Sequence, residues 1–395
     1  MNYHALAWVG IAIFVYSLSV RQLQRAELTG PMWFVLIGIS LALGFDQTLL
    51  LNQLDREIWQ PLVELTLAIF LFSDAAKTRL RVLMESVHLP LLLLLVGLPL
   101  TVVFATVMAH FSLGLSWLAA ALLAIIIAPT DAALCRGFIT AKQVPANLRE
   151  AINVESGLND GLCVPLFLLA MSAFNNPEEL SGASLLAVFV REIGIAVLVA
   201  VTFTALAIFL ISKAKERHLF AQSTSPFLFV GFAITVYALT QGLHGSGFIA
   251  AFVSGLLFDK FYHDAFKDQL IEEGENIAEL ASVLIWILFG FISVSTIMSL
   301  SWETVFYALC AVTLLRIVPV VLALYFSRES WKSKLTLAWF GPRGMASVVF
   351  TMMLLELEQP EVQTISQVAV CTILLSVFLH GLTTRPISLS FSNKS

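Results

Sequence analysis

Charged residues are scarce in this sequence. Asp, Glu, Lys and Arg make up 12% of the 395 residues, whereas hydrophobic residues make up 58%. A soluble protein has about 25% charged residues, and a chain this apolar could not bury its hydrophobic side chains in one core. The composition therefore excludes an ordinary soluble domain. Apolar runs long enough to cross a bilayer recur along the whole chain, which predicts an all-α, polytopic integral membrane protein in a lipid bilayer.

Cysteine is also rare, with four residues and no C-x-x-C spacing. This excludes a disulfide framework and a cysteine-based metal site, and we interpret the four as buried thiols. No basic stripe is present, so we expect no nucleic-acid partner, and we expect no cofactor. The first apolar run, Ala5 to Val20, lacks a basic flank and a cleavage site, which predicts a retained span.

Polar clusters, glycines and prolines divide the chain into about thirteen apolar segments, each interpreted as a transmembrane helix. Their approximate limits are 4–20, 31–46, 58–76, 89–111, 115–139, 147–174, 184–212, 224–242, 245–259, 276–299, 302–327, 333–356 and 362–383. The longest polar stretch, about Asp259 to Glu275, is interpreted as a loop. We therefore expect a single transporter domain over residues 1–395, without a soluble regulatory domain.

The loop charges predict the orientation of the chain. Basic residues gather in one set of alternate loops and in the C-terminal tail, and include Arg79 and Arg81. The other set holds Arg56 and acidic residues such as Glu178 and Glu179. Because positive charge collects on the cytoplasmic side, we expect the N-terminus outside and the C-terminus in the cytoplasm, in a bacterial inner (cell) membrane.

Ionisable residues concentrate in spans five and six. Span five contains Pro129, Thr130 and Asp131, and proline removes a backbone donor and interrupts a helix. Such a break leaves carbonyl oxygens beside a hydroxyl and a carboxylate, which are hard ligands suited to a small alkali cation. Unwound backbone at membrane depth occurs where it is buried in protein or lines a cavity. The sequence therefore predicts a cation site at this break.

Span six brings two carboxylates, an amide and a hydroxyl onto one helix face. Glu155 and Asn159 are four residues apart, and so are Ser156 and Asp160. A wholly apolar run follows, so this polar face is not expected to face lipid. The alternative, a polar network that only joins helices, remains open. We expect these residues to lie opposite the break in span five.

Three arginines, Arg191, Arg316 and Arg343, lie within apolar spans, where a charge is costly. Arg343 belongs to a Gly-Pro-Arg-Gly sequence that predicts a second helix break in span twelve. Arginine does not readily lose its proton and needs an acidic partner. We expect a structural ion pair between Arg343 and Glu155, and the role of Arg316 stays open.

The order of the breaks suggests an inverted repeat. Spans one to six (about 4–174) and eight to thirteen (about 224–383) form two halves, joined by a linker helix at about 184–212. The interrupted spans five and twelve are each the fifth of their half. Transporters often place such helices at the midplane, where Asp131 and Arg343 would offset the dipoles of crossed half-helices.

Taken together, these motifs resemble one known family. Thr130-Asp131, Glu155-Ser156-x-x-Asn159-Asp160 and Arg343-Gly344 are similar to the sodium/proton exchanger (NhaP-type) branch of the cation:proton antiporters. The resemblance implies alternating access, with Asp160 binding cation and proton in turn and Thr130 and Ser156 as further Na⁺ ligands. It also places Asn159, Asp131 and Asp74 in the cation- and proton-binding site, although relatives often have glutamate at the position of Asp74, and it implies a homodimer.

The resulting hypothesis is electroneutral exchange of one Na⁺ (or Li⁺) for one H⁺. Asn159 cannot carry a proton, and relatives with asparagine here resemble electroneutral exchangers. A K⁺/H⁺ antiporter of the same fold is the main alternative. A cation channel would need a continuous polar pore, and an intramembrane protease would need a G-x-G-D motif, which Asn159-Asp160-Gly161 is not. We therefore expect a transporter and not an enzyme.

Overall fold

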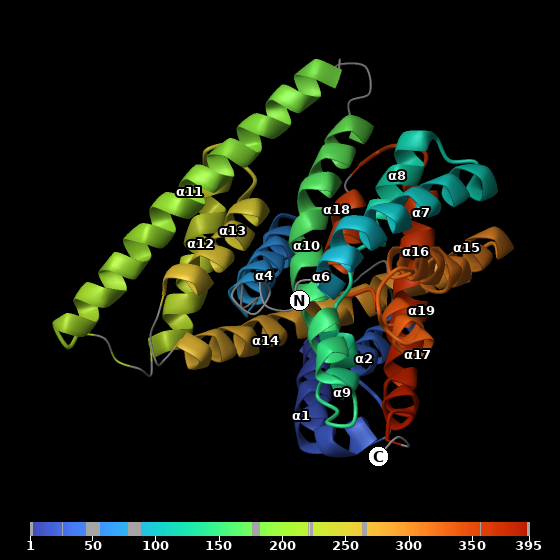
Figure 1. The fold of residues 1–395 in the computed structure, drawn as a ribbon, viewed down its shortest axis with the longest axis horizontal. Helices are drawn as coiled ribbons and strands as arrows, with labels where there is room; N and C mark the ends of the chain where they lie inside the picture. The colour runs from blue at the N-terminus through green and yellow to red at the C-terminus, as the bar shows by residue number, and fades with distance from the viewer. Residues whose placement is uncertain are drawn as a thin grey trace. The chain divides into compact units, whose positions relative to one another are not determined.

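The computed structural model describes residues 3–25, 27–44, 56–77, 88–175, 182–219, 221, 224–262, 267–355 and 357–392. All regular elements in these ranges are helices (Figure 1), because apolar segments can satisfy their backbone groups in lipid only as helices or closed barrels. The elements are α1 Tyr3–Arg25, α2 Gly30–Gly44, α4 Arg56–Lys77, α6 His88–Leu92, the π-helix η1 Leu93–Gly97, α7 Leu98–Leu113, α8 Trp117–Ile126, the 3₁₀ helix η2 Ala132–Cys135, α9 Arg136–Ile139, α10 Ala146–Asn175, α11 Gly182–Glu216, α12 Ser225–Gly242, α13 Gly247–Phe261, α14 Lys267–Met298, α15 Trp302–Val312, α16 Leu314–Ala323, α17 Trp331–Trp339, α18 Met345–Leu354 and α19 Val362–Leu389.

Seven stretches within the described residues are long and apolar enough to cross a membrane. They are Leu6–Leu23, His88–Leu113, Ala146–Asn175, Ala187–Glu216, Lys267–Met298, Trp302–Ala323 and Val362–Leu389. Shorter apolar helices occupy Gly30–Gly44, Trp117–Ile126, Pro226–Gly242 and Met345–Leu354. The protein is thus an integral membrane protein with multiple spans, and the total of thirteen stays a prediction. Several loop residues used to predict the orientation, Arg79, Arg81, Glu178 and Glu179, lie outside the described residues.

The chain divides into two compact units. Unit 1 consists of Met1–Leu62, Leu89–Ser156 and Ser282–Ser395, and unit 2 consists of Val63–His88 and Gly157–Ala281. Helix α10 belongs to both, because the division falls between Ser156 and Gly157. The inverted repeat proposed from the sequence stays a prediction.

In unit 1, two glycines allow α2 and α14 to approach each other closely. A Cβ added at Gly38 would lie 2.1 Å from the Ile287 carbonyl oxygen, and one added at Gly290 would lie 2.3 Å from the Val35 carbonyl oxygen. Small residues at such contacts let helix backbones pack directly in membranes. The pair therefore fixes α2 against α14.

The apolar core of unit 1 surrounds the segment where α17 ends. Phe138 of α9 and Phe340 lie with their ring centroids 4.4 Å apart, and Leu337, Leu324 and Leu148 belong to the same buried cluster. Since α9 and α17 each lie next to a helix interruption, this core packs the two interruptions into one region.

In unit 2, α11, α12 and α13 run side by side (Figure 1). Phe72 of α4 packs against Phe229 and Phe232 of α12 and Phe258 of α13, with centroids 4.7, 5.3 and 5.9 Å apart. Gly255 of α13 brings that helix onto α4, since an added Cβ would lie 2.4 Å from the Phe72 carbonyl oxygen. These contacts hold the Phe-rich end of α4.

Candidate functional site

The first predicted break lies between α8 and η2. Helix α8 ends at Ile126, and residues up to Asp131 have no helical conformation except a turn at Ile127. Pro129 lies in this segment and has no backbone donor, which prevents the helix from continuing. The segment is buried, with Ala128 and Thr130 each 1% exposed.

The second predicted break lies between α17 and α18. Helix α17 ends at Trp339, and α18 begins at Met345. Gly341 and Pro342 lie between them, and Arg343 is 2% exposed. Both interruptions therefore occur where the proline and glycine pattern predicts them.

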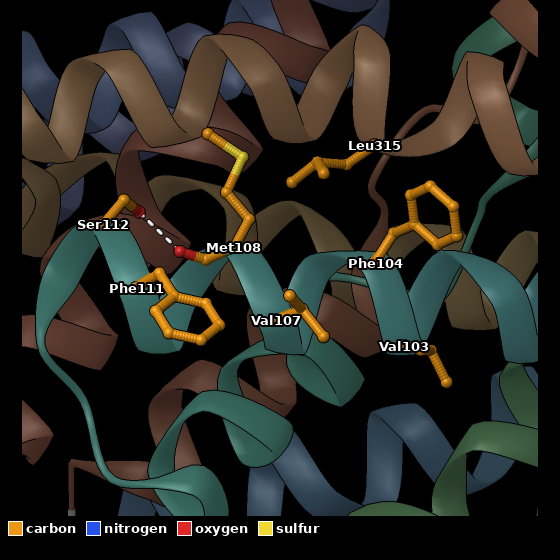
Figure 2. A pocket seen from close by; sticks show the side chains of 7 residues that line it. All are labelled: Val103, Phe104, Val107, Met108, Phe111, Ser112 and Leu315. Atoms are coloured by element: carbon orange, nitrogen blue, oxygen red, sulfur yellow. Dashed lines mark hydrogen bonds between the residues drawn. The ribbon is translucent and has the colours of Figure 1, made fainter.

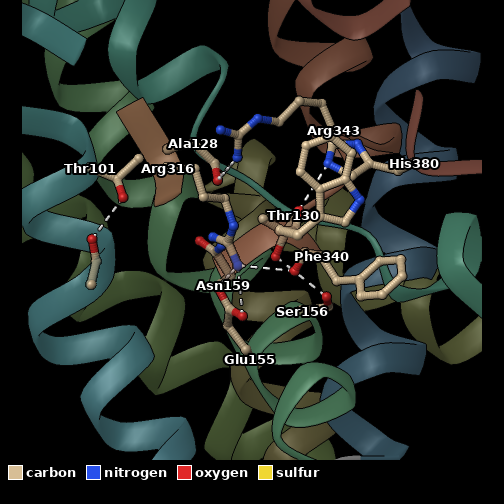
Figure 3. Close-up of polar contacts among 12 residues, drawn as sticks. Thr101, Ala128, Thr130, Glu155, Ser156, Asn159, Arg316, Phe340, Arg343 and His380 are labelled. Atoms are coloured by element: carbon tan, nitrogen blue, oxygen red, sulfur yellow. Dashed lines mark hydrogen bonds and ion pairs between the residues drawn. The ribbon is translucent and has the colours of Figure 1, made fainter. Parts of the chain in front are cut away.

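Hydrogen bonds to main-chain carbonyls join the two breaks. The Asp131 N–H donates to the Pro342 carbonyl at 2.8 Å, and the Arg343 Nη1 donates to the Ala128 carbonyl at 3.0 Å (Figure 3). Gly344 leaves no space for a side chain, because an added Cβ would lie 2.0 Å from the Asp131 Cβ. The two unwound segments thus pack directly on each other.

The Asp131 carboxylate lies at the start of two helices. Its Oδ1 accepts from the Ala133 N–H of η2 at 2.8 Å, and its Oδ2 accepts from the Met345 N–H of α18 at 3.4 Å. A carboxylate at a helix N-terminus satisfies free N–H groups and offsets the positive end of the dipole. This is the position at the breaks that the sequence predicts for Asp131.

The buried ion pair has a different arginine from the one predicted. Glu155 binds Arg316 of α16, whose Nη2 lies 2.8 Å from Oε1 and 2.9 Å from Oε2 (Figure 3). Both side chains are almost fully buried, at 2% and 3% exposure. The predicted pairing of Glu155 with Arg343 is wrong, because the Arg343 guanidinium instead donates to the carbonyls of Ala128 and Ala311.

A hydroxyl pair lies beside these charges. The Thr130 Oγ1 and Ser156 Oγ are 3.3 Å apart, and their residues are 1% and 5% exposed (Figure 3). Thr130 comes from the first break and Ser156 from α10. The structure therefore brings together two of the predicted cation ligands within unit 1.

Asn159 and Asp160 lie on the next turn of α10, in unit 2. Asn159 is 0% exposed and Asp160 is 8% exposed. The Asn159 Oδ1 accepts from the Cys163 Sγ at 3.1 Å, so part of the amide is already used within the helix. A site that joins Thr130, Ser156 and Asp160 combines residues of both units and stays a prediction.

Asp74 lies near the end of α4, in unit 2, and is partly buried. Its neighbour Ser73 is fully buried, and the same helix turn is held by the phenylalanine cluster around Phe72. The predicted contribution of Asp74 to cation binding stays a prediction.

One groove of unit 1 is not a candidate for the cation site. It has a volume of about 500 Å³ and is lined by Val103, Phe104, Val107, Met108, Phe111, Ser112 and Leu315 (Figure 2). Its one polar lining residue, Ser112, donates its hydroxyl to the Met108 carbonyl at 2.7 Å. A lining of six apolar side chains and one hydroxyl, without a carboxylate, is a poor site for an ion.

Sequence reasoning missed the partners that hold the breaks. The sequence leaves the role of Arg316 open, and the structure shows it as the partner of Glu155. Ser376 and His380 of α19 were overlooked, although Ser376 accepts from the Arg343 N–H at 2.7 Å and the His380 Nε2 lies 3.0 Å from the Trp339 carbonyl. Their four-residue spacing in an apolar helix was the available signal.

Comparisons with known proteins cover nearly the whole chain. The family described as "Sodium/hydrogen exchanger, transmembrane" matches residues 9–389. The K(+)/H(+) antiporter NhaP of Alkalimonas amylolytica is 24% identical over 95% of this chain and 65% of its own length. The Na(+)/H(+) antiporter NhaH of Halobacillus dabanensis is 23% identical over 95% of both chains. The K(+)/H(+) antiporter NhaP2 of Shewanella sp. (strain MR-4) is 22% identical over 80% of this chain and 55% of its own length.

The chain spans less than two thirds of the length of the K(+)/H(+) antiporters that it matches. Among solved structures, the sodium proton antiporter MjNhaP1 from Methanocaldococcus jannaschii has the same fold, with a TM-score of 0.81 at 19% identity over 99% of both chains. With a family match over residues 9–389, the chain belongs to the sodium/hydrogen exchanger transmembrane family.

Proposed function

We propose that the protein is a secondary antiporter that exchanges a small monovalent cation for protons by alternating access. The observation that carries this proposal is the contact between the two breaks. Each unwound segment satisfies backbone groups of the other, next to the hydroxyl pair of Thr130 and Ser156. Interrupted helices at membrane depth are the arrangement with which transporters bind ions.

Asp160 is the proposed exchanging carboxylate. A proton and an alkali cation can compete for one carboxylate, and that competition is sufficient to couple their movements in opposite directions. Asp160 lies one turn after Ser156 on α10, and Thr130 and Ser156 would supply further oxygen ligands to the cation. Asp131 and the Glu155–Arg316 pair would hold this arrangement without exchanging protons.

Na⁺ (or Li⁺) is the proposed cation, and K⁺ is the second candidate. The relative named as a Na(+)/H(+) antiporter matches this chain over 95% of both lengths, which favours Na⁺. Several other relatives are named as K(+)/H(+) antiporters, which keeps K⁺ as the alternative. Hydroxyl and carboxylate oxygens can serve either ion.

The proposed stoichiometry is one cation for one proton. Asn159 precedes Asp160, and an amide does not exchange a proton during transport. Glu155 is assigned no second proton in this scheme, because Arg316 Nη2 contacts both of its carboxylate oxygens. Asp131 contributes none because it caps the starts of η2 and α18.

We further propose that the N-terminus lies outside and the C-terminus in the cytoplasm of a bacterial inner membrane, and that the protein is a homodimer. The charge distribution of the loops supports the orientation. The dimer rests on the family resemblance alone. Chemical cross-linking in native membranes would test it.

The experiment that tests the function uses the purified protein in proteoliposomes with an internal pH-sensitive dye. Pulses of Na⁺, Li⁺ and K⁺ are compared, and we expect proton movement with Na⁺ and Li⁺. A response to K⁺ alone would favour the second candidate, and no response to any cation would contradict antiport. With the membrane potential clamped, the equilibrium Na⁺ gradient should match the proton gradient; a voltage-dependent endpoint would contradict the one-for-one ratio.

A further inference from the structure

Helix α19 carries polar residues at every fourth position. We call Thr372, Ser376, His380, Thr384 and Ser388 the α19 stripe, and all five are buried. Residues four apart are neighbours on a helix surface, so the stripe is a line of buried polar side chains that winds slowly along α19. Buried polar groups in membrane helices are expensive and tend to be functional. Nothing in the proposed exchange chemistry uses this stripe.

Two members of the stripe hold the ends of the second break. The Arg343 N–H donates to the Ser376 Oγ at 2.7 Å. The His380 Nε2 lies 3.0 Å from the Trp339 carbonyl (Figure 3 shows the ring beside Arg343). A carbonyl can only accept, so the tautomer with the hydrogen on Nε2 donates to Trp339 and leaves Nδ1 to accept from the Ser376 hydroxyl. One helix therefore fixes the residue before the unwound segment and the residue at its end.

Ser376 and His380 also contact each other. The His380 Nδ1 lies 3.0 Å from the Ser376 Oγ and 2.9 Å from the Ser376 carbonyl. With Ser376 at 0% and His380 at 1% exposure, no solvent competes for these bonds. The pair acts as one clamp, because moving either side chain disturbs both ends of the break.

One chain of contacts, which we call the first arm, leads from the clamped break to Ser156. The Phe340 carbonyl, within the break, accepts from the Arg316 Nη2 at 3.2 Å. The same Nη2 binds the Glu155 carboxylate, and Glu155 immediately precedes Ser156 on α10. These contacts link the break to the turn of α10 that carries the Ser156 hydroxyl.

A second arm leads to Thr130. The Pro342 carbonyl accepts from the Asp131 N–H at 2.8 Å, and Asp131 immediately follows Thr130. The two arms start on either side of Gly341 and end at the two hydroxyls, which are 3.3 Å apart. The segment that α19 clamps thus contacts, directly or through Arg316, the immediate neighbours of both hydroxyl residues.

We propose that Ser376 and His380 are positioning residues for cation binding, and that they act by fixing the break so that Thr130 and Ser156 stay at ligand spacing. The inference rests on the proposed function, since it concerns the affinity of the same site. Neither side chain contacts the cation in this account. Loss of the clamp therefore weakens cation binding and leaves the exchanging carboxylate in place.

The first test compares two Ser→Ala variants within the stripe. Ser376→Ala removes the acceptor of the Arg343 N–H. In Ser388→Ala, by contrast, the lost hydroxyl donates to the Thr384 carbonyl of the same helix at 2.7 Å and has no partner on another described helix. We expect Ser376→Ala to raise the KM for the cation about three- to tenfold, with a maximal rate within about twofold of wild type. Ser388→Ala should keep the wild-type KM. Equal KM values for both variants would overturn the proposal.

The second test uses conservative replacement of His380. Gln can place an amide N–H near the position of Nε2 and donate to Trp339, whereas Leu has no donor. We expect His380→Leu to raise the KM for the cation as Ser376→Ala does. In His380→Gln the KM should return most of the way to the wild-type value. A merely structural residue would lower the yield of folded protein without this rescue of KM. If Ser376→Ala does not fold, equal KM values for His380→Gln and His380→Leu would overturn the proposal.

A binding measurement distinguishes failure of the proposed function from failure of the positioning role. The melting temperature of the detergent-solubilised protein is measured against Na⁺ concentration, and the midpoint should shift to higher Na⁺ in Ser376→Ala. If wild type shows neither stabilisation by a cation nor proton movement, the proposed function fails. If wild type responds and the midpoint is the same in Ser376→Ala, only the positioning role fails.

Discussion

The two breaks of unit 1 are built from different residues, and each completes the other. The first contains Pro129 and ends in an acidic residue, Asp131, whose carboxylate lies at the start of α18. The second contains Pro342 and a basic residue, Arg343, whose guanidinium reaches the Ala128 carbonyl beyond the end of α8. Each charge thus offsets the backbone end of the opposite helix. The comparison shows that the charged side chains of both breaks bind backbone groups at helix ends.

This difference explains why Glu155 binds Arg316. Both Nη atoms of Arg343 donate to backbone carbonyls, those of Ala128 and Ala311. Arg316 lies on a separate helix and can present Nη2 to both carboxylate oxygens. The two buried arginines therefore have distinct partners, and mutation should separate their effects.

The largest effect is expected from breaking the buried ion pair. Removing one member of such a pair leaves the other charge buried, so Arg316→Ala and Glu155→Ala should each cost about 3–5 kcal/mol of stability. The double variant should lose less than the sum, because the two groups interact directly. Thermal unfolding in detergent measures all three variants.

The control is a second double-mutant cycle, which combines Glu155→Ala with Arg343→Ala. Its coupling should be clearly smaller than that of the Arg316 cycle, because the Arg343 donors contact backbone carbonyls. Strict additivity in the Arg316 cycle would contradict the assignment of the pair. So would a larger coupling with Arg343.

The sequence predicted the positions of both breaks and the polar face of α10, because proline, glycine and four-residue spacing act locally. It did not predict the partner of Glu155. The three intramembrane arginines Arg191, Arg316 and Arg343 could not be ranked by spacing, since pairing depends on which donors the freed carbonyls engage in the folded chain. The roles of Ser376 and His380 could not be predicted for the same reason, because both residues contact a segment far away in the sequence.

The close contact of the breaks can be tested at Gly344. An alanine Cβ would lie 2.0 Å from the Asp131 Cβ, so Gly344→Ala should push the segments apart and cost about 1–3 kcal/mol. Gly194→Ala is the control, because that glycine of α11 has no atom within 4 Å of an added Cβ and should gain slightly in stability. Thermal shifts of equal size in both variants would show that the breaks are not in tight contact.

A smaller effect is expected at Asp131. Asp131→Ala removes the acceptor for the N–H groups of Ala133 and Met345 and should cost about 1 kcal/mol. Asp131→Asn retains an acceptor and should lose less. The comparison is made by thermal unfolding at fixed pH, and an Asn variant as unstable as the Ala variant would argue against capping.

Cation-driven proton movement by Asp160→Asn in proteoliposomes tests the central claim most directly. The control is Asp268→Asn, the same chemical change at an exposed aspartate of unit 2. We expect Asp160→Asn to reconstitute as well as wild type and to move no protons when Na⁺, Li⁺ or K⁺ is added, whereas Asp268→Asn retains exchange. Robust exchange by Asp160→Asn would contradict the account.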